Sequence, residues 1–387
     1  MDKQQMAMSH RLSELGSMTP AEKLFFGLLR SGLWGEVPEL PDTAPGEDDW
    51  KKVCSLSKSQ TVAGLVTDGA AACPAGFVPR AVSLKLMSSL VRTEKTNETL
   101  NSQVSRFVTL LENSGVQPVL VKGQAVAQCY IHPSGRMPGD IDLVIDPGQY
   151  EAAKAVITPI ADSTDAENTD KMHFGAMFGS LELELHGTVR TSLGQKINDV
   201  LDDAQAQIFT EGGCRFWDCL GTQVRIPSVD FDALFIFTHL LQHFFCGGLG
   251  LRQLCDWARV LHTHCSAIDR DLLVKRLSKM GLLSEWKTFV GFLVVYLGLP
   301  EEEAPLYDAR YSSKTDRLWA YFERVGNFGK NRGLRDRSRD PYLIRKIESM
   351  FINSRDFLHH VGIFPLDSLR FFWYYFRTGT LNVLHGI

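Results

Sequence analysis

The sequence predicts an α+β protein, in which a small mixed β-sheet is flanked by N-terminal helices and a C-terminal helical domain. Two short apolar runs, 117–121 and 141–145, have strand-like composition, and a strictly alternating run follows at 181–186. Apolar residues at helical spacing occupy long stretches on both sides of these runs. We therefore divide the chain into a helical region (1–114), a core (115–227) and a helical domain (228–387).

The N-terminal region is expected to form helices at 21–33 and 79–113, where apolar residues recur at helical spacing. Residues 36–48 are rich in Pro, Gly and Asp and are expected to form a loop. We expect these helices to pack against the sheet.

The first predicted strand runs into Lys122 and Gly123, and the composition of 124–130 favours a helix. Glycine lets the backbone approach a ligand closely, and the N–H groups at the start of a helix favour anions such as phosphate. Lys122 adds a positive charge. This strand-turn-helix therefore predicts a phosphate-binding turn formed by Lys122, Gly123 and Gln124. The alternative for Gly123 is an ordinary tight turn.

Asp140 and Asp142 lie two positions apart in the second strand and therefore face the same side, while Ile141 and Leu143 face the core. Two like charges this close are unfavourable unless a cation or a shared proton compensates them. Oxygen ligands of this kind suit Mg²⁺ or Mn²⁺. The pattern predicts a divalent-metal site, with a solvated strand end as the alternative.

The segments on either side of this strand complete the predicted core. Residues 129–139 contain two prolines and two glycines and are expected to form a loop beside the site, from which Arg136 could reach a phosphate. Asp146 and Pro147 are typical of a helix start, and this helix is expected to end near Ile157.

The alternating strand at 181–186 directs its leucines inward and places Glu182, Glu184 and His186 on the opposite face. One of these glutamates could be the third carboxylate that two-metal transfer chemistry uses to hold the catalytic metal and to help deprotonate the attacking hydroxyl. A half-exposed strand with a polar outer face is the alternative.

These residues resemble, in their order, the uncharacterised nucleotidyltransferase family, a bacterial branch of the DNA polymerase β-like superfamily. The resemblance covers about residues 50–265. It is carried by Lys122-Gly123, Arg136 with Asp140-Ile141-Asp142-Leu143, His173, Glu184-Leu185-His186, and His239 and His243 followed by the segment 250–257.

The resemblance implies a transferase with a divalent metal ion. The implied catalytic and metal-binding residues are Asp140, Asp142 and Glu184, with Glu182 the less favoured third acid. The implied nucleotide-binding residues are Lys122, Gly123, Gln124 and Arg136. It also places His173 and His186 near the acids, where they could orient a carboxylate or contact phosphate.

The predicted activity is transfer of NMP from an NTP to an acceptor hydroxyl, with Mg²⁺ or Mn²⁺ as cofactor. The acceptor is left open among RNA, a small molecule and a protein; the motif order also resembles the toxin nucleotidyltransferases of abortive-infection systems, some of which modify tRNA. Gln124 stands where the wider superfamily has Ser or Gly, and the interval from Gly123 to Asp140 is long. The alternative is a catalytically inactive nucleotide-binding or protein-interaction module.

The region after Pro227 is expected to be helical at 231–245, 251–264, 269–280 and 285–297, and to bind the acceptor or act as a scaffold. His239 and His243 are spaced to share a helix face and could hold zinc, but their apolar neighbours favour partly buried, hydrogen-bonded histidines. We expect no metal site at His262, His264 and Cys265, and no disulfide between Cys214 and Cys219.

Two C-terminal segments could bind a partner. The segment 330–346 is locally basic and could contact a nucleic-acid backbone, although a solvated loop is the commoner outcome. The aromatic run 371–376 is expected to complete the helical core.

Composition narrows the class of protein but does not identify a partner. A net charge of −4 argues against a strong overall attraction to nucleic acid. The eight cysteines form no Cys-x-x-Cys pair and no secretory pattern is clear, so we expect a reducing cytoplasm. The longest apolar stretch, 289–297, is shorter than the ~20 residues of a membrane-spanning helix.

Overall fold

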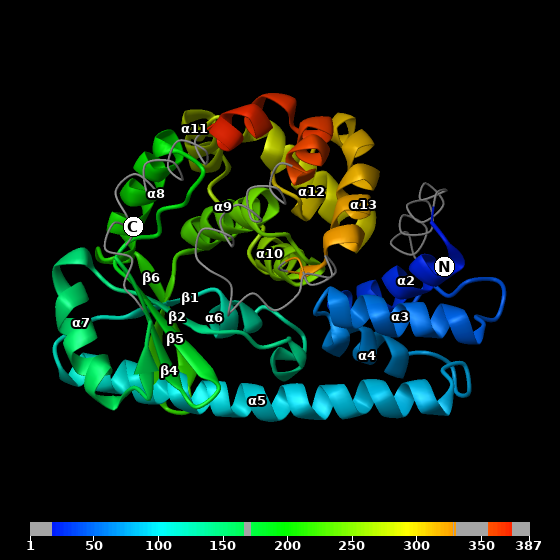
Figure 1. The fold of residues 1–387 in the computed structure, drawn as a ribbon, viewed down its shortest axis with the longest axis horizontal. Coiled ribbons are helices and arrows are strands. Elements are labelled where there is room, and N and C mark those ends of the chain that lie inside the picture. Colours follow the sequence, from blue (N-terminus) through cyan, green and yellow to red (C-terminus); the bar gives the residue numbers. More distant parts are fainter. Residues whose placement is uncertain (1–17, 166–171, 328, 330–354, 374–387) are drawn as a thin grey trace.

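A helix of 34 residues, α5 (Arg80–Asn113), forms the base of the molecule and joins its N-terminal helices to its sheet (Figure 1). The computed structural model describes residues 18–165, 172–327, 329 and 355–373. At a rise of 1.5 Å per residue, α5 is about 51 Å long. Two of its asparagines hold segments beside the sheet. Asn97 Nδ2 donates to the carbonyl oxygens of Ser134 and Arg136, at 2.6 and 2.8 Å, and Asn101 Oδ1 accepts from Gln124.

In the described part of the chain, three further helices precede α5: α2 (Pro20–Trp34), α3 (Glu47–Ser59) and α4 (Ala63–Ala71). Thr19 and Glu22 form a reciprocal capping box at the start of α2, and Gly35 ends it in the left-handed region. The structure confirms the predicted helices at 21–33 and 79–113, whereas the pattern analysis did not predict α3 and α4.

The five-stranded sheet has the order β1-β2-β5-β4-β3. Strands β2 and β5 are parallel, while the β1–β2, β4–β5 and β3–β4 pairs are antiparallel, which confirms a small mixed sheet. The strands are β1 (Val119–Val121), β2 (Ile141–Val144), β3 (Ser163–Thr164), β4 (His173–Phe178) and β5 (Leu181–His186).

The two faces of the sheet differ as the alternation predicted. Ile141, Leu143, Leu183 and Leu185 are buried in a core with α5 and with α7 (Tyr150–Ile157). The side chains between them face the opposite way. The turn before α7 differs from the prediction, because Pro147–Gln149 forms a 3₁₀ turn, capped by Asp146, and the α-helix begins only at Tyr150.

The rest of the described chain is helical apart from one hairpin, and its helices arch over the sheet (Figure 1). Residues 355–363 and 365–373 are also helical. The remaining elements are α8 (Gln195–Ile208), the hairpin strands β6 (Cys214–Cys219) and β7 (Thr222–Pro227), α9 (Val229–Cys246), α10 (Leu251–Thr263), α11 (Arg270–Met280), α12 (Leu283–Leu297) and α13 (Thr315–Val325). Within the described residues, none of the helices has the length and apolar character needed to cross a membrane.

The N-terminal helices α2–α4 and the C-terminal helices α8–α13 share one hydrophobic core, although long stretches of sequence separate them. The Arg30 guanidinium on α2 donates to the carbonyl oxygen of Tyr296 on α12 at 3.0 Å, and the indole of Trp34 donates to that of Leu297. The two predicted helical regions therefore meet on one side of the sheet.

The α2–α4 contact depends on glycines at the crossing. A Cβ atom at Gly69 on α4 would lie 2.0 Å from the carbonyl oxygen of Leu28 on α2, so any side chain there forces the helices apart. We expect Gly69→Ala to reduce the free energy of unfolding by about 1–3 kcal/mol through overpacking, measured by chemical denaturation.

Gly362 is the matched control, because it is exposed in a helix and a Cβ there meets no atom within 4 Å. Gly362→Ala should be neutral or stabilising by up to about 1 kcal/mol, since alanine is the better helix former. Equal effects at the two glycines would contradict the close-packing account.

Candidate functional site

The turn after β1 places a lysine beside the acidic face of the sheet. Lys122 has φ +55° and ψ −151°, a conformation that side chains rarely adopt, and Gly123 follows at φ +41°. The short helix α6 (Gly123–Ala127) starts there, as predicted. Lys122 Nζ lies 2.8 Å from Asp142 Oδ1. Burial lowers the pKa of Lys122, but the charges of Asp142 and Asp140 raise it further, so the pKa is raised overall and the lysine stays charged.

Three carboxylates converge next to this lysine. Asp140 directly precedes β2, Asp142 lies on β2, and Glu184 on β5 is the register partner of Asp142. Their ligand oxygens all lie within 4.8 Å of one another. The negative charge of Asp142, together with burial, raises the pKa of Asp140, because a second carboxylate so close disfavours its ionisation.

Two histidines on the same sheet face support the acids. His173 and His186 are direct cross-strand partners on β4 and β5. The Nε2 atoms of His173 and His186 lie 3.3 and 3.2 Å from Glu184 Oε2, and His186 Nε2 lies 3.0 Å from Asp142 Oδ1. Burial raises the pKa of Glu184, but hydrogen bonds from His173 and His186 hold it well below its usual range, so Glu184 stays a carboxylate.

Lys122 and the three acids form one wall of a cavity of about 240 Å³, and α9 and α10 form the facing wall. In this second wall, His239, His243 and the segment 250–257 were expected only as part of the family resemblance, and the two histidines also as a possible zinc pair; none was predicted to bind nucleotide. The full lining consists of Lys122, Gly123, Val126, Arg136, Gly139, Asp140, Asp142, Glu184, Ile236, His239, His243, Arg252, Gln253 and Asp256. A sequence signal exists in retrospect, because Arg252 and Asp256 place charges one helical turn apart in an otherwise largely apolar helix.

His239 and His243 bond to each other, with their Nε2 atoms 3.0 Å apart, which agrees with the expected hydrogen-bonded pair. Burial and the nearby charge of Lys122 lower the pKa of His243 to about 4, and the pKa of His239 also falls well below its usual value. Both imidazoles are therefore neutral at neutral pH, and this part of the wall can donate or accept hydrogen bonds without adding charge.

Arg136 lines the cavity but is held by a carboxylate. Its Nε and Nη2 atoms donate to the two oxygens of Asp256 on α10, each at 2.7 Å, and the Tyr130 hydroxyl donates to the same carboxylate at 2.7 Å. Arg136 is only 5% exposed. Contact between Arg136 and phosphate therefore stays a prediction, and Arg252, one turn before Asp256, is a second guanidinium in the same cavity.

Gln124 and Glu182 lie away from the converging acids. The Gln124 side chain is buried, and its amide donates to Asn101 Oδ1 on α5 at 2.5 Å, so only its backbone remains near the predicted phosphate turn. Glu182 occupies the next outward position on its strand face and pairs in register with Met177. Glu184 is thus the glutamate that joins the acid cluster.

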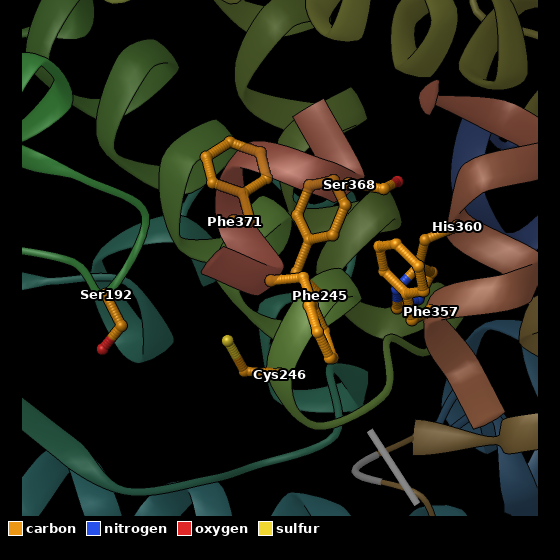
Figure 2. Close-up of a pocket in the computed structure, with 8 residues that line it drawn as sticks. Ser192, Phe245, Cys246, Phe357, His360, Ser368 and Phe371 are labelled. Carbon is orange, nitrogen blue, oxygen red and sulfur yellow. The ribbon is translucent and has the colours of Figure 1, made fainter. Parts of the chain in front are cut away.

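Among the residues that the structure describes, the other candidate positions show no comparable arrangement. A cavity of about 30 Å³ among the C-terminal helices is lined mainly by aromatic rings such as Phe245 and Phe371 (Figure 2). His262 hydrogen-bonds to Glu303, and Cys214 and Cys219 are both free. The basic segment 330–346 lies outside the described residues, as do residues 374–376 of the aromatic run, of which Phe371 is buried.

Comparison with known proteins gives one family. A family model described as an uncharacterised nucleotidyltransferase matches residues 46–293, which include both walls of the cavity. No curated protein and no solved structure gives a significant match to the chain.

The Arg136–Asp256 pair generates a stability prediction. Asp256→Asn should reduce the free energy of unfolding by about 3–5 kcal/mol, because it leaves a buried guanidinium without its counter-charge. Chemical denaturation of the purified variant measures this loss.

Asp202→Asn is the matched control, since Asp202 makes a similar bidentate contact with Arg190 at the surface. Exposed pairs contribute about 0–1 kcal/mol. A loss at Asp256 no larger than that at Asp202 would show that the buried pair does not hold the two walls together.

Proposed function

The chain belongs to the uncharacterised nucleotidyltransferase family, and from this premise we propose that it transfers NMP from an NTP to an acceptor hydroxyl at the cavity between the sheet and helices α9 and α10. The observation that carries the proposal is the convergence of Asp140, Asp142 and Glu184 within 4.8 Å on one wall of that cavity. A solvated strand end does not require three acids from two strands to meet beside a buried lysine.

The donor set fits a hard divalent cation. All three groups offer carboxylate oxygens, and Asp142 is almost fully buried. The negative charge of Asp142 raises the pKa of Asp140, and a bound cation would relieve this repulsion. We propose that Asp140, Asp142 and Glu184 hold Mg²⁺ or Mn²⁺. When bound, the ion supplies stabilisation of the negative charge that develops on the α-phosphate and on the departing pyrophosphate.

Lys122 and Arg252 are proposed to bind the triphosphate. Both line the cavity and are cationic, one on the turn after β1 and the other on α10. The backbone of Gly123 lies beside them, where the absence of a side chain allows a phosphate to approach. Arg136 also lines the cavity, but its charge is balanced by Asp256. This set would orient the α-phosphate over the three acids.

In the proposed reaction, an acceptor oxygen forms a bond to the α-phosphorus as the bond to the bridging oxygen of pyrophosphate breaks. The acceptor hydroxyl passes its proton to a carboxylate of the acid cluster, for which we propose Glu184, and pyrophosphate leaves with the electron pair of the broken P–O bond. The contribution of the chain is positioning, because it brings the two reactants together in a fixed site. The neutral His239–His243 pair can hydrogen-bond to hydroxyl groups of the nucleotide or of the acceptor.

The acceptor is left open among RNA, a small molecule and a protein. RNA, and tRNA in particular, is the case suggested by the resemblance to toxin nucleotidyltransferases. The alternative of an inactive nucleotide-binding or interaction module predicts metal-dependent nucleotide binding without turnover on any acceptor.

The acid cluster generates the central prediction. We expect wild-type protein with Mg²⁺ or Mn²⁺ to move label from one α-labelled NTP to the RNA, protein or small-molecule fraction of a cell extract. Asp140→Asn, Asp142→Asn and Glu184→Gln should each lower this rate at least 1,000-fold, roughly 4 kcal/mol of activation free energy.

Glu182→Gln is the matched control, because it removes an acid from the same face of β5 but outside the cluster. Its rate should stay within about tenfold of wild type, since it acts only through the long-range field. Labelling that survives Asp140→Asn and Asp142→Asn would refute the metal assignment. Metal-dependent NTP binding with no labelled fraction would favour the inactive module.

Arg252 generates a binding prediction. Arg252→Gln should weaken NTP binding by about 10- to 100-fold, because a charge-assisted hydrogen bond is worth about 1.5–3 kcal/mol. Calorimetric titration with a non-hydrolysable NTP measures the effect, and circular dichroism checks the fold. Arg252→Lys, which keeps the charge, should recover part of the affinity; unchanged affinity in Arg252→Gln would place the triphosphate elsewhere.

A further inference from the structure

We propose that His173, Glu184 and His186 form a second divalent-metal site, selective for a transition metal, that shares Glu184 with the carboxylate site. The three residues come from adjacent antiparallel strands, β4 and β5, and their ligand atoms all lie within 4.8 Å of one another. The inference concerns metal binding alone and does not depend on transferase activity.

The separations match the edges of a coordination polyhedron. The Nε2 atoms of His173 and His186 lie 3.3 and 3.2 Å from the same oxygen of Glu184, Oε2. Metal–ligand bonds of about 2.0–2.1 Å in tetrahedral geometry place neighbouring ligand atoms roughly 3.3–3.4 Å apart. An ion could therefore enter this group with little movement of the side chains.

The rigidity of the strands supports the same conclusion. His173 and His186 face each other in register, so neither the backbone nor the strand spacing has to change to bring the imidazoles together. Their ring centroids are 4.8 Å apart. Site preorganisation of this kind is what distinguishes a metal site from a chance grouping of polar side chains.

The ligand chemistry differs from that of the carboxylate site. Imidazole nitrogen suits Zn, Cu, Fe and Ni ions, whereas carboxylate and water oxygens suit Mg and Mn. Two histidines with one carboxylate are a recurrent set for such ions. The neighbouring pair of sites would therefore select different metals.

The charges around the group favour a cation. Gly175, the register partner of Glu184, has no side chain; a Cβ there would lie 3.0 Å from Asp165 Oδ2 and 3.5 Å from Glu182 Oε1. Two further carboxylates thus border the site. The His173 side chain is 37% exposed, so an ion can reach the group from solvent.

The shared carboxylate links the two sites. Glu184 belongs to both groups, and His186 Nε2 also lies 3.0 Å from Asp142 Oδ1. A transition metal at the histidine site would fix the orientation of Glu184 and add positive charge beside the carboxylate site. Binding at either site would consequently change affinity at the other.

Cobalt(II) tests the proposal, because Co²⁺ bound by imidazoles in a low-coordinate site absorbs visible light much more strongly than Co²⁺ in an octahedral site of oxygen ligands. We expect CoCl₂ titrated into the full-length protein to give an intense visible band that saturates at one equivalent. His173→Ala should weaken binding at this site by at least about 100-fold, as loss of a direct ligand exceeds the 10- to 100-fold effect of an outer-shell partner.

Three further variants complete the test, one as a second ligand variant and two as controls. His173→Asn, which retains a polar side chain on β4, should lose the band as well if His173→Ala does not fold. Asp140→Asn should keep the band, since it removes only the carboxylate site and the proposed transfer activity. His262→Ala removes an imidazole that contacts a different glutamate, Glu303, and should also keep it.

No intense band in the wild type, or a band that persists in His173→Ala or His173→Asn, would overturn the proposal. A band lost in His262→Ala would overturn it too, because the ion would then lie at the other histidine–glutamate pair. Because Asp140→Asn separates cobalt binding from transfer, failure of the proposed transferase activity and failure of the second site are distinguishable.

Discussion

The repulsion between carboxylates on one face of the sheet is the constraint on which the rest of the site depends. Parallel pairing of β2 with β5 sets Asp142 beside Glu184, and Asp140 precedes them at the strand entrance. Lys122, from the turn after β1, and His186, from β5, both contact Asp142 and offset this charge. An apolar core on the other face holds both strands in register, so the acids cannot separate to relieve their repulsion. The concentration of negative charge on this face is thus fixed by the pairing of two strands.

The parts of the site that sequence could predict are those governed by local periodicity. Alternation along a strand placed Asp140 and Asp142 on one face, and Glu184 opposite its flanking leucines, without knowledge of any partner. The hairpin β6–β7 and helices α3, α4 and α8 were not predicted from the sequence, although the apolar residues of α8 recur at helical spacing; α4 has only nine residues. The pairing of His173 with His186 depends on the register of β4 against β5, which no single segment specifies.

Long-range pairing explains the difference at Arg136. The loop before β2 was predicted to offer this guanidinium to phosphate, but α10 supplies Asp256 from 120 residues away. A buried charge requires a counter-charge, and nothing in the local sequence shows which helix provides it. The same holds for Arg252 and His243, which reach the cavity only because the C-terminal helices arch over the sheet (Figure 1). Periodicity identified their helices without identifying what those helices face.

The contacts of two asparagines on α5 have a consequence for the local opening of the cavity's border. Asn97 holds the backbone of the Arg136 loop, and Asn101, one turn further along the same helix, holds Gln124 next to the lysine turn. Both segments that border the cavity are thus fixed to one long helix, whose C-terminal part is buried along the same face. Local opening of either segment would have to loosen the other, so amide hydrogens in the two loops should exchange with solvent as a single cooperative unit.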